Sequence, residues 1–297
     1  MKASIQFILS MIIFGTIGLV VRYIDLSSSE TALFSSSIGC LFLTIVYISQ
    51  RNKFSWKKIR QYAIILFVSG IALAGNWIFL YQSYDYTTLT NATLGYYFAP
   101  VFVMLLSPII LKEKLPIKKV ICIVVAVIGM ISIVGNGFSA TGTDDLLGIT
   151  FGITAAVFYA ALMLLNKFIK EMNRLEVTII QLGVTALILL PYVLLTEGLN
   201  MLSVSSSSIP FILFLGIVNT GIGFWLFFSG MEHLKGQSIA MLSYVDPLVA
   251  ILISGLILQE QFTLLQVIGG LLLLGSTIVS ETRFRRTTEK VNRSEYE

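Results

Sequence analysis

The sequence predicts an all-α polytopic membrane protein with ten transmembrane helices, arranged as two inverted repeats of five. Three observations support this fold class. Of the 297 residues, 56% are hydrophobic and 12% are charged, which is about half the charge of a typical soluble domain. The apolar residues gather in runs of about 20, the length that a helix needs to cross the hydrocarbon core. Two long stretches of the chain also resemble each other.

Ten apolar runs are separated by short polar segments. None of these segments approaches the ~50 residues that an independent soluble domain needs. We therefore expect the protein to act inside the bilayer. The predicted spans, with ends good to about 2–4 residues, lie at 4–22, 29–49, 60–82, 89–111, 117–134, 146–168, 175–195, 209–230, 237–258 and 263–281.

The first run also has features of a signal peptide, because Lys2 precedes an apolar stretch from Ile5 to Val21. That stretch is long for a signal peptide, and no clear cleavage site of small residues follows it. We therefore interpret it as the first span. Cys40 and Cys122 lie inside apolar runs, so no disulfide is expected.

The basic residues fix the orientation of the spans, because cytoplasmic loops collect Lys and Arg. With the N-terminus inside, nineteen of the twenty basic residues fall on the cytoplasmic side and Arg22 alone falls outside. One missed span would destroy this alternation. We therefore predict ten spans with both termini in the cytoplasm. The net charge of +4 is thereby explained without a nucleic-acid partner.

A duplication links the two halves of the chain. The segment 77–131 parallels the segment 225–279, with Pro100 matching Pro247 and Glu113 matching Glu260 at an offset of 147. We expect each of these glutamates to cap or brace the turn into the next span. Each half holds five predicted spans, an odd number, so the second half is inverted relative to the first. The expected units are a first repeat at 1–136, a linker at 137–145, a second repeat at 146–281 and a disordered cytoplasmic tail at 282–297.

Two motifs carry a family resemblance. They read AxxGYYFAPVFVMLLSPIILKEKL in the first half and AMLSYVDPLVAILISGLILQE, followed by QVIGGLLLLGS, in the second. Both resemble the signature of EamA-type proteins of the drug/metabolite transporter superfamily. The resemblance implies a transporter, often an exporter of amino acids or other metabolites, that alternates between inward-open and outward-open states. Family members frequently carry an Arg early in the second span, where this chain has Ser35, Ser36 and Ser37. We therefore do not expect the anion-binding role of that Arg in this protein.

Pro100 and Pro247 occupy matching positions near the middle of the fourth and ninth spans. A proline inside a span frees a backbone carbonyl, which needs cover from protein or a cavity. Paired breaks of this kind are typical of a central site between two repeats. We therefore interpret both prolines as helix-break and gating positions. A plain kink that helps packing is the alternative.

Asp246 is the carboxylate nearest the middle of a predicted span. Placing an Asp there costs roughly 2.5–3.5 kcal/mol, so such a residue usually faces a cavity or a partner. It can serve as a proton carrier, a ligand for a cationic substrate or a gate partner. The alternative is a protonated Asp that bonds to a neighbouring helix. The matching position in the first half is Ala99, so any proton-carrying role is asymmetric.

Aromatic and amide side chains complete the predicted pocket. Aromatic faces can enclose an organic substrate, whereas amides either orient a ligand or bond across helices, which is their commoner use in membrane bundles. The candidates for substrate binding or coupling besides Asp246 are Asn76, Trp77, Tyr81, Asn91, Tyr96, Asn219, Trp225 and Tyr244.

These features favour a secondary transporter of a small organic metabolite, such as an amino acid, an amine or an amphiphilic drug, in the plasma membrane of a bacterium. No nucleotide-binding loop, metal-ligand cluster or nucleophile motif occurs, and His233 is alone. We therefore expect no enzyme, catalytic residue, metal or cofactor. The expected partners are the substrate and membrane lipid, with proton coupling and a homodimer left open. The alternative function is a non-transporting scaffold or receptor.

Overall fold

The computed structural model describes residues 2–87, 92, 95–134, 143–196, 198, 204–257 and 264–281. Within these ranges all regular structure is helical, and no strand occurs. Asn91, Glu260, most of the predicted linker and the tail at 282–297 lie outside the described residues.

In the first half of the chain, the helices fall on the first five predicted spans. A turn at Thr16 divides the first span into two helices. The third span begins before residue 60, where we expected its start. The bounds are α1 (Lys2–Gly15), α2 (Ile17–Val21), α3 (Ser28–Ser49), α4 (Trp56–Tyr86), α6 (Ala99–Ile110) and α7 (Ile117–Val134).

In the second half, the helices fall on the other five predicted spans. The eighth span contains a π-helix, in which each N–H bonds to the carbonyl five residues back. The bounds are α8 (Thr143–Asn166), α9 (Arg174–Thr196), α10 (Ile209–Phe214), the π-helix η3 (Leu215–Ile222), α11 (Gly223–His233), α12 (Gly236–Leu242), α13 (Val245–Leu256) and α14 (Leu264–Glu281).

Several of these segments suit a bilayer. Among the described residues, six helical segments are long and apolar enough to cross a membrane, and shorter apolar helices accompany them at Ala99–Ile110 and Val267–Ser280. The outer surface is apolar as well, since Ile64 and Leu195 expose 79% and 87% of their area. This distribution fits a protein whose outer surface faces lipid. The structure is that of a polytopic helical membrane protein.

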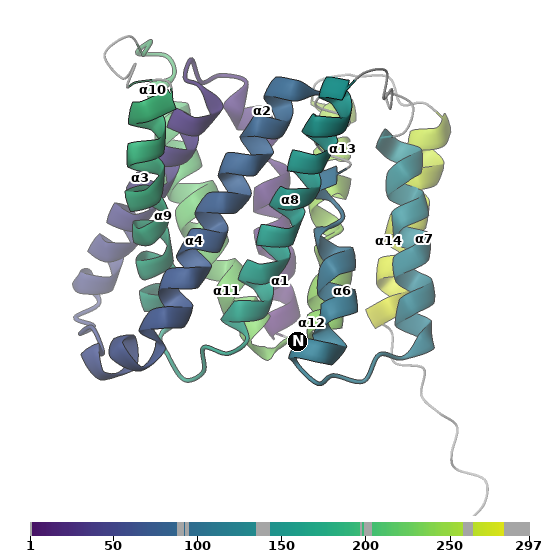
Figure 1. Cartoon of the computed structure of the whole chain (residues 1–297), viewed down its shortest axis with the longest axis horizontal. Coiled ribbons are helices and arrows are strands. Elements are labelled where there is room, and N and C mark those ends of the chain that lie inside the picture. The colour runs from purple at the N-terminus through teal and green to yellow at the C-terminus, as the bar shows by residue number, and fades with distance from the viewer. Residues whose placement is uncertain are drawn as a thin grey trace, which may run out of the picture.

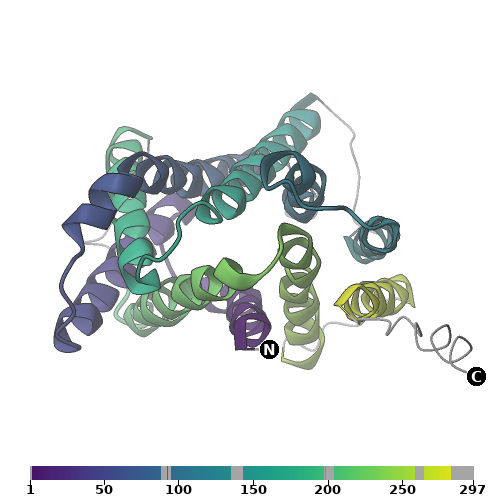
Figure 2. The same cartoon turned by 90° about the horizontal axis from the view of Figure 1, so that it is seen from below.

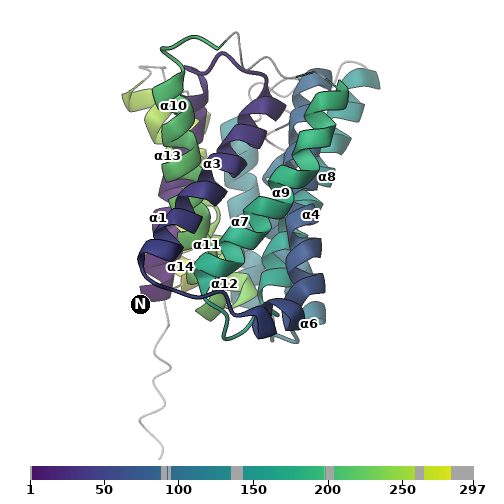
Figure 3. The same ribbon diagram turned by 90° about the vertical axis from the view of Figure 1, so that its left-hand side faces the viewer.

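The helices run side by side in one bundle (Figure 1). The N-terminal end of α1 lies at the lower end of the bundle, with the connections at 50–55, 111–116, 167–173 and 234–235 (Figures 1 and 3). Most of the basic clusters found in the sequence belong to these connections or to the helix turns beside them. Their basic residues therefore gather at one end of the molecule.

Packing joins the two halves through matching pairs of helices. Helix α3 packs on α9, α7 on α14 and α6 on α12, and each pair joins helices of the same rank in the two halves. The first span of each half packs on the third span of the other half. These two equivalent contacts are α1 with α11 and α8 with α4. Figure 2 shows α7 and the yellow helix α14 together at one edge of the bundle.

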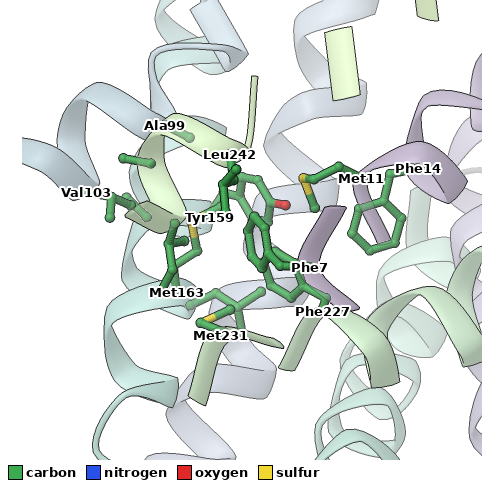
Figure 4. Packing of buried hydrophobic residues seen from close by; sticks show 14 of the residues in the cluster. Phe7, Met11, Phe14, Ala99, Val103, Tyr159, Met163, Phe227, Met231 and Leu242 are labelled. Atoms are coloured by element: carbon green, nitrogen blue, oxygen red, sulfur yellow. The ribbon is translucent and has the colours of Figure 1, made fainter. Parts of the chain in front are cut away.

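The largest buried cluster lies between the two halves. It contains side chains from α1, α6, α8, α11 and α12, and its aromatic members include Phe7, Phe14, Tyr159 and Phe227. Figure 4 shows Tyr159 and Phe227 close to Phe7 within this cluster. The interior of the bundle is therefore rich in aromatic rings, and the broken helices described below border it.

Candidate functional site

The fourth and ninth spans are both broken just before their matching prolines, Pro100 and Pro247. Tyr97 and Phe98 form a turn before α6, and Pro100 lies in the first turn of α6. Ser243 and Tyr244 form the matching turn between α12 and α13, and Pro247 lies in the first turn of α13. A proline fits the first turn because its missing N–H has no helical acceptor there. The two prolines thus start new helices and do not kink continuous ones.

Asp246 lies beside the break in the ninth span, in the first turn of α13. Its side chain is partly exposed. Among the described residues, no hydrogen bond or ion pair reaches its carboxylate. The hydroxyl groups of Tyr96, Tyr97 and Tyr159 lie within electrostatic reach of it. These tyrosines belong to the break in the fourth span and to α8.

A chain of aromatic rings extends from these tyrosines through the core. The ring of Tyr159 stacks on Tyr96 with a centroid distance of 5.6 Å and on Phe227 with a distance of 5.9 Å. Phe227 in turn meets Phe224, which lies 6.0 Å from Trp77. We call these five residues the aromatic cluster. It connects α4, α8, α11 and the helical residues 95–96 that precede the turn before α6.

The predicted amides bind backbone groups of other helices. Asn76 in α4 donates to the carbonyl of Ala155 in α8 at 2.8 Å. Asn219 in η3 donates to the carbonyl of Ile13 at 2.7 Å and to the hydroxyl of Thr16 at 2.8 Å. Both side chains are buried. These contacts fit the alternative in which amides bond across helices.

The other predicted residues lie around the aromatic cluster or away from it. Trp225 packs on the main core, while Tyr81 packs on a separate cluster between α3 and α9. Tyr244 borders a small void beside Val127 and Met130 of α7, and its buried hydroxyl has no hydrogen-bond partner among the residues that the structure describes. Tyr96 therefore lies within electrostatic reach of both Asp246 and Tyr81. Trp77 is connected to Tyr96 through the other rings of the aromatic cluster, and Tyr244 lies beside α7.

Sequence reasoning missed several interior residues. Tyr97, Tyr159, Phe224 and Phe227 were read as parts of apolar runs, and only the three-dimensional packing places them near Asp246 or Trp77. Spacing along a single span carried no signal for Tyr159, because its partner Tyr96 belongs to another span.

One end of the bundle is closed by polar contacts. The ammonium of Lys167, in the connection after α8, donates to the last carbonyls of α11, at 3.1 Å to Met231 and 3.0 Å to Glu232, and also to the carbonyl of Leu234. Burial lowers the pKa of Lys167, and the nearby Glu113 opposes this shift. Lys167 thus satisfies carbonyls that the end of α11 leaves free.

Further contacts at this end connect the two halves of the chain. The carboxylate of Glu113 accepts the N–H of Gly236 at 3.2 Å, so it caps α12 of the opposite half. We had expected it to cap or brace the turn that follows it in the chain. Gln237 donates to the carbonyl of Lys114 at 2.6 Å, and Lys119 bonds to Ser238 at 2.8 Å. We call these three bonds the cross-half contacts.

The described residues contain no group of three or more His, Cys, Asp or Glu side chains that could hold a metal ion. The arrangement as a whole offers one accessible acid, aromatic rings and two helix breaks.

Comparisons with known proteins agree with this architecture. An uncharacterized transporter, YxxF of Bacillus subtilis (strain 168), is 32% identical over 260 residues, which is 84% of this chain and 80% of the relative. The uncharacterized inner membrane transporter YicL of Salmonella typhimurium is 25% identical over 295 residues, 96% of this chain and 97% of the relative. A solved crystal structure, 18% identical, shares the fold with a TM-score of 0.82 over 96% of this chain and 98% of that chain.

A family model settles the relationship. The model of the EamA-like transporter family matches residues 1–135 and again residues 146–282. This confirms the resemblance that the two motifs indicated. Together with the apolar helices and the relatives named as transporters, it identifies a multi-pass membrane transporter. The chain belongs to the EamA-like transporter family.

Proposed function

We propose that this protein is a secondary transporter that exports a small organic metabolite by alternating access, in the plasma membrane of a bacterium. The observation that carries the proposal is the position of Asp246, a partly exposed acid without a partner among the described residues, at a helix break beside aromatic rings. A membrane protein rarely keeps an acid inside a span unless it serves transport or a partner.

Two inverted repeats provide the alternation. The helix pairs that exchange with the halves, and the two separate matches to one family model, support this arrangement. In repeats of this kind, the substrate site lies where the broken helices meet, near the middle of the bilayer. Here both breaks border the region of Asp246 and Tyr96.

The collection of basic residues at one end supports a cytoplasmic location for that end and for both termini. Lys167 and the cross-half contacts hold this end together. The conformation described here is then closed toward the cytoplasm. Transport requires these contacts to break while the opposite end closes, with the helices moving at the breaks before Pro100 and Pro247.

Asp246 also offers a route for proton coupling. A carboxylate in the interior binds either a proton or a cationic group of the substrate, and the release of one favours binding of the other. Because the first half has Ala99 at the matching position, a single acid performs this exchange.

The test compares cells that produce the wild type, Asp246→Asn or no transporter. Metabolomics of the medium identifies compounds that only the wild-type cells export. Asp144→Asn, which changes an exposed carboxylate at the start of α8, is the matched control. We expect export to be lost in Asp246→Asn and kept in Asp144→Asn. Equal media from wild-type and empty cells, across many growth conditions, would contradict the proposed function.

Coupling is tested with the compound so identified. In proteoliposomes, Asp246→Asn should lose uptake driven by a pH gradient while retaining exchange of labelled for unlabelled substrate. Unchanged gradient-driven uptake would exclude Asp246 as the proton carrier.

A further inference from the structure

The first turns of α4 carry basic and aromatic side chains at the lower edge of the bundle. Helix α4 has 31 residues, or about 46 Å at 1.5 Å per residue, whereas the hydrocarbon core is about 30 Å thick. The excess amounts to roughly three turns. Because the basic residues Lys57, Lys58 and Arg60 lie at its start, that end extends into the headgroup region.

A shallow, wide-open hollow lies on these turns and is lined by Trp56, Lys57, Arg60 and Gln61. Trp56 is 75% exposed, and the other three residues are exposed as well. Tryptophan is typical of the boundary between headgroups and hydrocarbon. The hollow therefore combines two positive charges with an interfacial aromatic ring.

Neighbouring charged groups are engaged elsewhere. Lys58 donates to the carbonyl oxygen of Glu171. The buried carboxylate of Glu176 accepts the N–H of Ser55 at 2.7 Å. Neither Lys57 nor Arg60 forms an ion pair with another described residue. The two charges in the hollow are thus available to an anionic ligand.

Further along the same helix, toward the middle of the bundle, lies an apolar stripe. Ile64, Phe67, Val68 and Ile71 follow Arg60 at spacings of four, seven, eight and eleven residues, which puts them on one face. All four are exposed, Ile64 most of all. A charged site that continues directly into an exposed apolar stripe matches a phospholipid, with its phosphate at the edge of the bundle and its acyl chains toward the middle.

We propose that this hollow binds an anionic phospholipid. Its phosphate lies between Lys57 and Arg60, its headgroup lies against Trp56, and an acyl chain follows the stripe from Ile64 to Ile71. A free phosphate ion would use the same two charges, but it would leave the stripe unused. The rule that basic residues stay on the cytoplasmic side explains where these residues lie, yet it predicts no preference for one lipid at this position.

The test uses quenching of Trp56 fluorescence in phosphatidylcholine vesicles that contain a fixed fraction of brominated phosphatidylglycerol or brominated phosphatidylcholine. The difference between the wild type and Trp56→Phe isolates the signal of Trp56. A basic residue near an anionic surface contributes about fivefold to binding. We therefore expect phosphatidylglycerol to bind at least about fivefold more tightly than phosphatidylcholine. Equal quenching by both lipids would overturn the proposal.

Variants show whether the lipid preference depends on this hollow or on positive charge anywhere at this end of the bundle. Lys57→Gln with Arg60→Gln should abolish the preference, while Lys57→Arg with Arg60→Lys should keep it. Lys112→Gln with Lys114→Gln, which removes two exposed charges at the same end of the bundle, is the matched control and should also keep it. Loss of the preference in the control variant would contradict a site at α4.

The source of the phosphate is tested by adding soluble glycerol phosphate. We expect no displacement of brominated phosphatidylglycerol, because the acyl chain contributes to binding. Full displacement would show a site for small anions and would overturn the assignment to a lipid. Size-exclusion profiles of all variants show whether each remains folded.

Discussion

Arg174 and Glu232 form a two-point ion pair that joins the start of α9 to the end of α11. The Nε of Arg174 lies 2.7 Å from one carboxylate oxygen, and an Nη lies 2.6 Å from the other. Arg174 is only 7% exposed and also donates to the carbonyl of Ile169. Planar pairs of this kind fix orientation as well as distance.

We predict that this pair stabilises the closed end. The single variants Arg174→Gln and Glu232→Gln should each lower the thermal unfolding midpoint, because each leaves a partner desolvated without its counter-charge. In a double-mutant cycle, the coupling energy should be about 1–3 kcal/mol. Thermal unfolding of the three variants in detergent measures it. Additive effects of the two substitutions would show that the pair contributes nothing of its own.

Close packing of α7 on α14 depends on Gly129. A Cβ at this position would lie 2.8 Å from the carbonyl oxygen of Gly269. We expect Gly129→Ala to destabilise the protein by about 1–3 kcal/mol, the usual cost of overpacking. Gly275→Ala in α14 is the control, since a Cβ there meets nothing within 4 Å. The control should be neutral or stabilising by up to about 1 kcal/mol, owing to the helix propensity of Ala. Similar midpoints for both variants would contradict the close approach.

Tyr244 provides a test of whether a predicted site residue acts through its hydroxyl. That hydroxyl is fully buried, and no described residue forms a hydrogen bond with it. A buried polar group without a partner costs about 1–3 kcal/mol. Tyr244→Phe should therefore raise the unfolding midpoint and leave export unchanged. If export were lost although the unfolding midpoint rose, the hydroxyl of Tyr244 would be needed for transport and the prediction would be wrong.

The closed end should respond to alkaline pH through Lys167. Burial lowers the pKa of this side chain in the folded protein below its ordinary value of 10.5. At pH values between the folded-state pKa and 10.5, the unfolded chain therefore binds more protons than the folded chain. The contribution of Lys167 to stability therefore rises as the pH increases through that window.

This pH effect is measured as the difference in unfolding midpoint between the wild type and Lys167→Met. We expect the difference to increase toward pH 10.5. Lys170→Met, which changes an exposed neighbour, should show the same pH dependence of the unfolding midpoint as the wild type. A constant difference across this range would show that Lys167 is not desolvated in solution.

Much of the helical architecture could be predicted from the sequence, because long apolar runs in a bilayer have few alternatives to helix. The ranges of α3, α7 and α9, for example, agree with the predicted spans to within about one residue. The position of Asp246 near a break also followed from its neighbour Pro247. These features depend on local sequence.

The internal details of the site depend on contacts between distant segments. The turn at Thr16 and the π-helix η3 have no local marker, yet Asn219 connects them. Likewise, the pairing of Tyr159 with Tyr96 and of Lys167 with α11 arises only when the two halves pack together. Single-sequence periodicity contains no information on such pairs.

The π-helix has a further consequence for the aromatic cluster. A π-turn holds more residues than an α-turn, so the same eight residues wound as an ordinary α-helix would turn further around the helix axis. Everything downstream in α11 would then be rotated around that axis from its present position. Phe224 and Phe227 would swing away from Trp77 and Tyr159. The π-helical winding of this one segment thus determines which face of α11 points into the interior, and with it the position of both rings.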